Sequence, residues 1–326
     1  MAESESPALA ALAGTRHALV FPGQGSQFVG MGQALCQASP AARRVFGQAD
    51  DLLGFSLSRL CFEGPAEDLE DTWNSQPAIL VASVAALEAL RERLAADGAR
   101  LDPLAVAGHS LGEFTALIAA GVMSFEDTLR IVRERGRLMK QAGEERPGGM
   151  AAVLGLERDQ LEAVCARARA GGIILVANDN CPGQLVISGE VEPLLAAMDY
   201  AREAGAKRVT RLGISIASHS PLMAAAGEHL ARVIAAAPMA PPAMPVIANA
   251  SAEPLTSVEQ IRAELEHHVE SPVNWTATIR RMADMGVATY IEIGPGAVLS
   301  GLIKRIDREA ALLGVGDFGL PVDGKR

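Results

Sequence analysis

The sequence is short of aromatic residues and of paired cysteines, and each shortage argues against a class of protein. Aromatic side chains make up 4% of the 326 residues, too few for the stacking platforms that bind single-stranded nucleic acid. The four cysteines are scattered and form no CxxC pair, which argues against a disulfide framework and against a zinc site. Reduced thiols are typical of the cytoplasm, where we expect this protein. These cysteines are Cys36, Cys61, Cys165 and Cys181.

Long uncharged hydrophobic runs and an excess of positive charge are also missing. No stretch approaches about 18 apolar residues without a charge, so we expect no membrane span. The net charge of −10 argues against nucleic acid as a partner. Residues 1–16 carry acidic residues where a signal peptide needs basic ones, and we expect a disordered leader there. The glycine-rich residues 311–326 are expected to form a flexible tail.

Short apolar runs alternate with amphipathic stretches along most of the chain, which predicts an α/β fold. Residues 17–21 and 104–108 have the pattern of short buried strands. A long helix is expected over 77–96, with Pro77 in its first position. Later elements follow the same alternation: helices at 111–121, 124–141, 221–236, 257–270, 274–285 and 297–307, and strands at 213–217, 246–249 and 289–293.

The stretch between Gly148 and Leu212 has a compact pattern of its own. It contains a strand, a helix, two strands joined by a turn, a second helix and a last strand. This β-α-β-β-α-β order is that of the ferredoxin-like unit. We therefore expect a small domain over 147–212, inserted into a larger α/β domain built from residues 17–146 and 213–310.

One serine stands between two glycines at the point where a predicted strand gives way to a helix, in AVAGHSLGEFTALIAAG (105–121). Gly108 and Gly112 permit a sharp turn that lifts the hydroxyl of Ser110 out of the backbone. The free N–H groups of the helix N-terminus then face an oxyanion that develops beside it. We interpret Ser110 as a nucleophile. The alternative is a tight turn with an incidental serine.

A nucleophilic serine needs a base, and His219 is the histidine best placed for that role. It ends a predicted strand, and open α/β sheets carry their chemistry at such ends. It also follows Ser110 in the chain, as in α/β-hydrolase-like enzymes. The alternative is a structural histidine. No Asp or Glu stands at an obvious strand end between the two residues, so we expect a dyad whose imidazole is oriented by a carbonyl or amide. The other histidines are His17, His109, His229, His267 and His268.

Arg135 lies on the apolar side of the predicted helix 124–141. A helical projection places it within the arc formed by Val132, Gly136 and Met139, whereas Arg130, Arg133 and Arg137 project to the opposite side. A buried guanidinium needs an anionic partner, and its planar fork suits a carboxylate. We interpret Arg135 as the receptor for a carboxylate on the substrate. The alternatives are an internal salt bridge and a side chain that extends to water.

Seven motifs occur in the order found in one enzyme family. The chain resembles the malonyl-CoA:acyl-carrier-protein transacylases and the acyltransferase domains of polyketide and fatty-acid synthases, over about residues 17–307. That family combines an α/β-hydrolase-like large domain with a ferredoxin-like insertion, which agrees with the pattern above. The motifs are FPGQGSQ (21–27), NSQPA (74–78), GHSLGE (108–113), RERGRLM (133–139), SHSPLM (218–223), SPVNW (271–275) and EIGPG (292–296).

The resemblance implies a role for each matching residue. Ser110 would be acylated, with His219 as its base. The main-chain N–H groups of Gln24 and Leu111 would form the oxyanion hole. Arg135 would bind the malonyl carboxylate. The implied reaction transfers malonyl from malonyl-CoA to the phosphopantetheine thiol of acyl carrier protein through a malonyl-serine ester, for fatty-acid synthesis.

The resemblance also implies an acyl pocket shaped by Leu111 and by residues 216–219, selective for malonyl over methylmalonyl. It implies no metal or redox cofactor, with the CoA thioester as substrate. One residue departs from the family pattern: His268 stands where the family usually has a glutamine whose main-chain carbonyl helps to orient the catalytic histidine. We expect the residue at this position to orient His219.

Carrier proteins are usually acidic, so an acidic enzyme needs a local basic patch to bind one. Lys207, Arg208 and Arg211 are the expected patch, and the alternative is a solvated charged face. Three rival functions stay open: a discrete acyltransferase that serves a polyketide synthase in trans, a serine thioesterase or lipase, and a catalytically inactive interaction module. The missing acidic third residue and the absence of an HGGG-type loop argue against the hydrolase.

Overall fold

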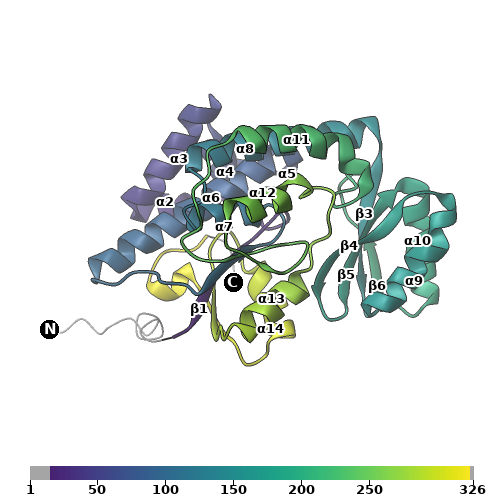
Figure 1. Ribbon diagram of the computed structural model, residues 1–326. Coiled ribbons are helices and arrows are strands. Elements are labelled where there is room, and N and C mark those ends of the chain that lie inside the picture. The colour runs from purple at the N-terminus through teal and green to yellow at the C-terminus, as the bar shows by residue number, and fades with distance from the viewer. Residues whose placement is uncertain (1–14, 324–326) are drawn as a thin grey trace.

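Two β-sheets organise the protein in the computed structural model, which describes residues 15–323 (Figure 1). The six-stranded sheet has the order β10-β9-β1-β2-β7-β8, and every neighbouring pair is parallel except β7 with β8. Its strands are β1 (His17–Phe21), β2 (Ala105–Gly108), β7 (Val246–Ile247), β8 (Pro254–Leu255), β9 (Thr289–Glu292) and β10 (Ala311–Gly314).

The parallel sheet is buried on both faces because its strands carry apolar side chains at successive positions. Leu19 and Phe21 of β1 face the core shared with the helices of one layer, whereas Ala18 and Val20 face the opposite layer. This is the two-residue alternation of a strand. The first layer comprises α6 (Thr72–Ala96), α7 (Gly112–Ala119), α8 (Phe125–Glu145) and α11 (Ala224–Ala236); the second comprises α13 (Trp275–Asp284) and α14 (Val298–Ile306).

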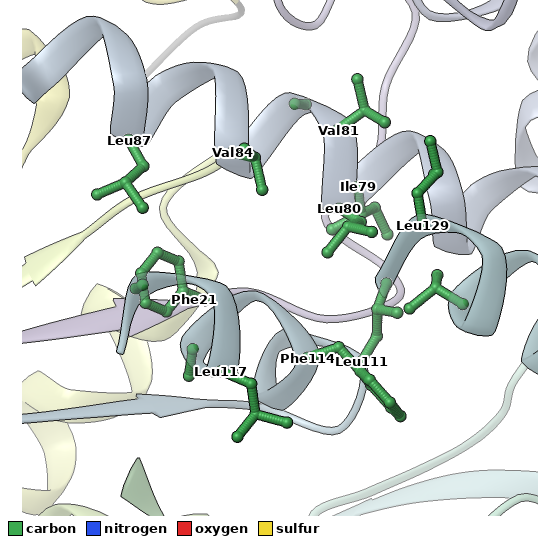
Figure 2. Close-up of a cluster of buried hydrophobic side chains, with 14 of the residues drawn as sticks. Phe21, Ile79, Leu80, Val81, Val84, Leu87, Leu111, Phe114, Leu117 and Leu129 are labelled. Carbon is green, nitrogen blue, oxygen red and sulfur yellow. The ribbon is translucent and has the colours of Figure 1, made fainter. Parts of the chain in front are cut away.

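Figure 2 shows the packing of the first layer, where Phe21 of β1 and Phe114 and Leu117 of α7 lie below the long helix α6. Helix α8 adds Leu129 to the same cluster, and Leu111 at the start of α7 is completely buried in it. The turn between β2 and α7 therefore packs against the largest core of the protein.

The second sheet is antiparallel, with the order β4-β5-β3-β6. Figure 1 shows it at one end of the molecule, with its two helices on the outer face. The predicted β-α-β-β-α-β order is confirmed. Its elements are β3 (Gly148–Leu154), α9 (Arg158–Ala168), β4 (Ile174–Cys181), β5 (Gln184–Glu190), α10 (Val191–Glu203) and β6 (Arg208–Arg211).

Residues 271–275 join the two sheets. The main chain of Val273 pairs with β4, since Val273 N donates to Ala177 O and Asp179 N donates to Val273 O, each at 2.9 Å. The hydroxyl of Thr276 donates to the carboxylate of Asp179 at 2.5 Å. The segment that precedes α13 is therefore held on one side by the small sheet.

The predicted start of the long helix is wrong. Helix α6 begins at Thr72, where the side chain of Asp71 accepts from Trp73 N, so Pro77 lies inside the helix. A proline cannot donate to the carbonyl four residues earlier. That carbonyl belongs to Trp73, and Arg133 Nη1 donates to it at 2.6 Å. An arginine from the neighbouring helix thus supplies the missing donor.

Several other expectations differ from the structure. Residues 213–217 form no strand but an irregular segment. The expected flexible tail is ordered at its start, because β10 pairs with β9 and the following turn buries Phe318. Of the expected leader, residues 1–14 lie outside the described residues. Arg16, at its end, is held by two hydrogen bonds, because its carbonyl accepts from Ala288 N and Thr289 N. The helix predicted over 257–270 is present as α12 (Val258–Glu266) and ends earlier than expected. Sequence analysis did not assign the helices α2 (Gln33–Ala38), α3 (Pro40–Leu53), α4 (Leu57–Glu63) and α5 (Ala66–Glu70).

Over residues 15–323, none of the helices has the length and apolarity needed to span a bilayer.

Candidate active site

Ser110 sits on a sharp turn between the end of β2 and the start of α7. Its φ of 49° lies in the left-handed region that non-glycine residues rarely adopt. A Cβ at Gly108 would collide with the backbone of Gly112, and a Cβ at Gly112 would collide with Phe21 O. Both glycines of the predicted elbow are therefore required by close backbone packing, and the strand–turn–helix prediction is confirmed.

The hydroxyl of Ser110 contacts the imidazole of His219. Ser110 Oγ lies 2.9 Å from His219 Nε2, and His219 Nδ1 lies 2.8 Å from Ser271 O. A carbonyl oxygen only accepts, so Nδ1 carries the proton and Nε2 is free to accept one from the serine. His219 also has a positive φ of 58°, and its N–H donates to Val269 O at 2.8 Å. The arrangement is a serine–histidine pair oriented by a main-chain carbonyl.

The environment of His219 keeps its ring neutral. Burial, and then the positive charge of Arg135, lower the pKa of His219 well below 6.5. A neutral imidazole with a free Nε2 can remove the proton of an adjacent hydroxyl at neutral pH.

Asn249 fixes the turn that carries Ser110. Its Oδ1 accepts from Ser110 N at 2.7 Å, and its Nδ2 donates to Gly108 O at 2.8 Å. Sequence analysis did not assign a role to this residue, although it is the last residue of the strand predicted at 246–249, and polar residues at the ends of such strands reach the site in open α/β sheets.

The main-chain N–H groups of Gln24 and Leu111 have no hydrogen-bond acceptor among residues 15–323. The loop that carries Gln24 lies directly against the elbow, because a Cβ at Gly23 would collide with His109 O. Leu111 is the N-cap residue of α7, and the first N–H groups of a helix have no partner within the helix. Both groups predicted to bind an oxyanion therefore belong to segments that lie next to Ser110.

Arg135 is buried, with 1% of its surface exposed. Its Nη2 donates to Ser110 Oγ at 3.1 Å, and its Nη1 donates to Gln76 Oε1 at 2.6 Å. No carboxylate lies within salt-bridge distance of Arg135 in the described part of the chain, and its Nε has no partner there. Neither alternative from the sequence applies: Arg135 forms no direct internal salt bridge and does not extend to water. Gln76, in the NSQPA motif, is a contact that sequence analysis did not find.

The expectation for His268 is wrong. The carbonyl that orients His219 belongs to Ser271, three residues further along the chain. The side chain of His268 is buried behind Arg135, with its Nδ1 3.5 Å from Arg135 Nη2 and its Nε2 3.2 Å from Glu113 Oε2. The ring centroids of His268 and His219 are 6.3 Å apart, so the two imidazoles are near neighbours without a direct hydrogen bond.

The remaining histidines lie away from the hydroxyl. His109 points away from Ser110, as its position on the elbow predicts, and its Nε2 lies 2.8 Å from Asn180 Oδ1 of β4. Within residues 15–323 no three His, Cys, Asp or Glu side chains are grouped so that they could hold a metal ion. The residues of the expected acyl pocket are all buried, and they include His219 and the residue that follows Ser110: Leu111 and 216–219.

Known proteins resemble this chain over most of its length. Residues 18–314 match the model of the acyl transferase domain family. A curated relative, the malonyl CoA-acyl carrier protein transacylase of Bacillus subtilis, is 44% identical over 301 residues, which cover 92% of this chain and 93% of the relative.

Solved structures of the same kind superimpose closely. The malonyl CoA-acyl carrier protein transacylase of Coxiella burnetii has a TM-score of 0.89 at 38% identity, covering 94% of this chain and 95% of that one. A malonyl-transacylase in complex with a type II PKS acyl-carrier protein has a TM-score of 0.88 at 39% identity, covering 93% and 98%. The α/β fold described above is that of these acyltransferase structures. The protein belongs to the acyl transferase domain family.

Proposed function

We propose that this enzyme transfers malonyl groups from malonyl-CoA to the phosphopantetheine thiol of acyl carrier protein. The observation that carries the proposal is the position of Arg135: a buried guanidinium, with no carboxylate of its own, donates to the serine hydroxyl that contacts His219. A nucleophile and a receptor for a carboxylate therefore lie side by side. The malonyl-transferring names of the relatives support the same reaction.

In the first half of the proposed reaction, Ser110 Oγ attacks the thioester carbonyl carbon while His219 Nε2 takes the hydroxyl proton. The oxyanion of the tetrahedral intermediate accepts from the main-chain N–H groups of Gln24 and Leu111. Collapse breaks the carbon–sulfur bond, and the imidazolium returns its proton to the departing CoA sulfur. Malonyl-serine remains on the enzyme.

In the second half, the phosphopantetheine thiol gives its proton to His219 and attacks the ester carbonyl. The carbon–oxygen bond breaks, and Ser110 recovers the proton from the imidazolium. The same two N–H groups serve both tetrahedral intermediates, so one site performs both halves of a ping-pong transfer.

In this scheme Arg135 binds the malonyl carboxylate through its unpartnered Nε and through Nη2, which now donates to Ser110. A fork of two parallel donors matches a carboxylate. An uncharged acyl chain would leave the buried guanidinium without a counter-ion, which penalises acetyl. Leu111 and residues 216–219 would limit the size of the acyl group.

The fold supports a finer description within the same proposal. The large sheet, with Ser110 at the carboxyl end of β2, is an α/β-hydrolase-like domain, and the small antiparallel sheet is a ferredoxin-like insertion. The four cysteines are buried and unpaired, which supports a cytoplasmic location. The reaction needs no cofactor, because the CoA thioester is itself the activated substrate.

Carrier-protein binding is assigned to the basic residues of the small sheet. Lys207, Arg208 and Arg211 are exposed at the edge strand β6, and none of the three forms an ion pair within residues 15–323. Cations without local partners are available to the acidic surface of a carrier protein. An alternative function is supply of malonyl to a polyketide synthase carrier, which the structural similarity to a type II PKS malonyl-transacylase favours.

Intact-protein mass spectrometry after mixing with malonyl-CoA tests the proposal. We expect a malonyl adduct within seconds, mapped by proteolysis to the peptide that contains Ser110, and its loss when a phosphopantetheinylated carrier protein is added. Acetyl-CoA should label much less. Release of free malonate without transfer would support the thioesterase, and no adduct with any donor would support the inactive module.

The pH dependence of malonyl loading is expected to reflect the lowered pKa of His219. A base whose pKa lies well below 6.5 stays neutral as the pH falls through 6.5, so loading continues there and declines only as the pH drops through the lowered pKa. Single-turnover rates measured from about pH 5 to 8 check this. An acidic limb centred near the ordinary histidine pKa contradicts it.

A further inference from the structure

Three polar side chains form a buried row behind the nucleophile. Glu113 comes from α7, Arg135 from α8, and His268 from the segment that follows α12. His268 Nε2 lies 3.2 Å from Glu113 Oε2, with each side chain 1% exposed, and His268 Nδ1 lies 3.5 Å from Arg135 Nη2. The side chains of His268 and Glu113 form no hydrogen bond with the side chain of Ser110 or His219 in the described residues.

The hydrogen-bonding groups on either side of His268 determine which of its ring nitrogens carries the proton. A guanidinium only donates, so the His268 nitrogen that faces Arg135 must accept. A neutral imidazole then carries its proton on the other nitrogen, which faces the Glu113 carboxylate. Burial, followed by the charge of Arg135, lowers the pKa of His268 to about 3 and supports the neutral form. The ring of Phe114 packs edge-on against the imidazole at 5.1 Å and restricts its rotation.

The ionisable groups of the row influence one another. Burial lowers the pKa of Arg135, and the charge of Glu113 opposes that shift. Burial likewise raises the pKa of Glu113 to about 8, and hydrogen bonding to Asn249 and then the charge of Arg135 oppose that shift. Glu264 is the other acidic group near the row, and its Oε1 accepts from Ala250 N at 2.9 Å. Glu113 is thus the acidic side chain that faces Arg135 across one imidazole, and it forms no direct ion pair with the guanidinium in the described residues.

We propose that Glu113 and His268 form a buried positioning pair that holds the Arg135 guanidinium against Ser110 and so sets the preference for acyl groups that carry a carboxylate. The inference rests on the proposed function. Gln76 accepts from Nη1, and His268 limits the direction of Nη2. The edge of the guanidinium formed by Nε and Nη2 is then left for the acyl group. A long side chain that is already oriented loses less freedom when it binds its ligand.

The test compares two replacements of His268. His268→Leu removes both polar atoms of the ring. His268→Gln is the conservative variant, because an amide also offers one acceptor and a donor. Single-turnover loading is measured with malonyl-CoA and with acetyl-CoA. We expect His268→Leu to lower malonyl kcat/KM by about 10- to 100-fold and to change acetyl loading by less than about threefold, whereas His268→Gln stays close to wild type. The adjacent exposed His267 supplies the matched control, His267→Leu, which should change neither rate.

The ratio of malonyl to acetyl loading is the decisive measurement, because a purely structural role of His268 would change both rates equally. Equal losses with both donors, or malonyl loading unchanged in a folded His268→Leu enzyme, would overturn the inference. Thermal unfolding and labelling of Ser110 with a fluorophosphonate report folding and nucleophile integrity. If His268→Leu does not fold, Glu113→Gln tests the same row, with an expected loss of about 3- to 10-fold in the malonyl-to-acetyl ratio; an unchanged ratio overturns it. Failure of the wild type to load malonyl would instead reject the proposed function.

Discussion

Alanine in place of Ser110 is expected to abolish the acyl-enzyme and to lower malonyl transfer by about 10⁵- to 10⁶-fold. The substitution removes the only atom that can carry the ester in the proposed scheme, while the main-chain N–H groups of Gln24 and Leu111 remain. Because the elbow is fixed by Asn249 and by close glycine packing, the fold should survive. Quenched single-turnover assays with radiolabelled malonyl-CoA measure the loss.

The affinity of Ser110→Ala for malonyl-CoA distinguishes the loss of the nucleophile from a general disruption of the binding site. Ser110→Ala should bind malonyl-CoA within a few-fold of wild type by calorimetry, since Arg135 keeps Gln76 as its anchor. Ser56→Ala, at an exposed serine, is the matched control and should transfer at the wild-type rate. A mass adduct on Ser110→Ala at the wild-type rate would mean that another residue is the nucleophile.

Alanine in place of Arg135 is expected to lower malonyl kcat/KM by about 10²- to 10³-fold, a loss of roughly 3–4 kcal/mol in transition-state stabilisation. The malonyl carboxylate would enter a buried site without a counter-charge, which is costly. Acetyl has no such charge, so its loading should stay level or rise. The preference between the two donors is therefore expected to narrow or reverse.

Parallel loading assays with malonyl-CoA and acetyl-CoA measure this change of preference. Arg130→Ala is the matched control on the same helix, since Arg130 is exposed and pairs with Glu126. Arg135→Lys keeps the charge but not the planar fork, and should recover only part of the malonyl rate. A uniform loss with both donors would contradict a role in binding the carboxylate and would leave Arg135 as a structural residue.

The parts of the site that sequence analysis predicted are those set by local pattern. The glycines around Ser110 follow from the strand-to-helix turn, and the burial of Arg135 follows from the helical period of α8. His219 could be found by elimination because the chain has six histidines. The succession of strands and helices along the small domain was also predictable, since each of its elements has a clear period.

The parts that could not be predicted depend on contacts between distant residues. Asn249 reaches the elbow across 139 positions, and Ser271 rather than His268 meets the imidazole because the chain turns after α12. Pro77 was misplaced because the donor for the orphaned carbonyl comes from Arg133 on another helix. Residues 311–318 were expected to be flexible, but they are ordered because β10 pairs with β9, and no local sequence pattern encodes that pairing.

The junction at residues 271–275 limits how this protein can be recombined with its relatives. Val273 pairs with β4 of the small sheet, and Ser271, two residues earlier, supplies the carbonyl that meets His219 Nδ1. A hybrid that takes only residues 148–211 from a relative therefore replaces β4, one of the two partners in the backbone pairing that positions Ser271 and, through it, His219. The small sheet and residues 271–275 form one unit of exchange, although more than fifty residues of sequence separate them.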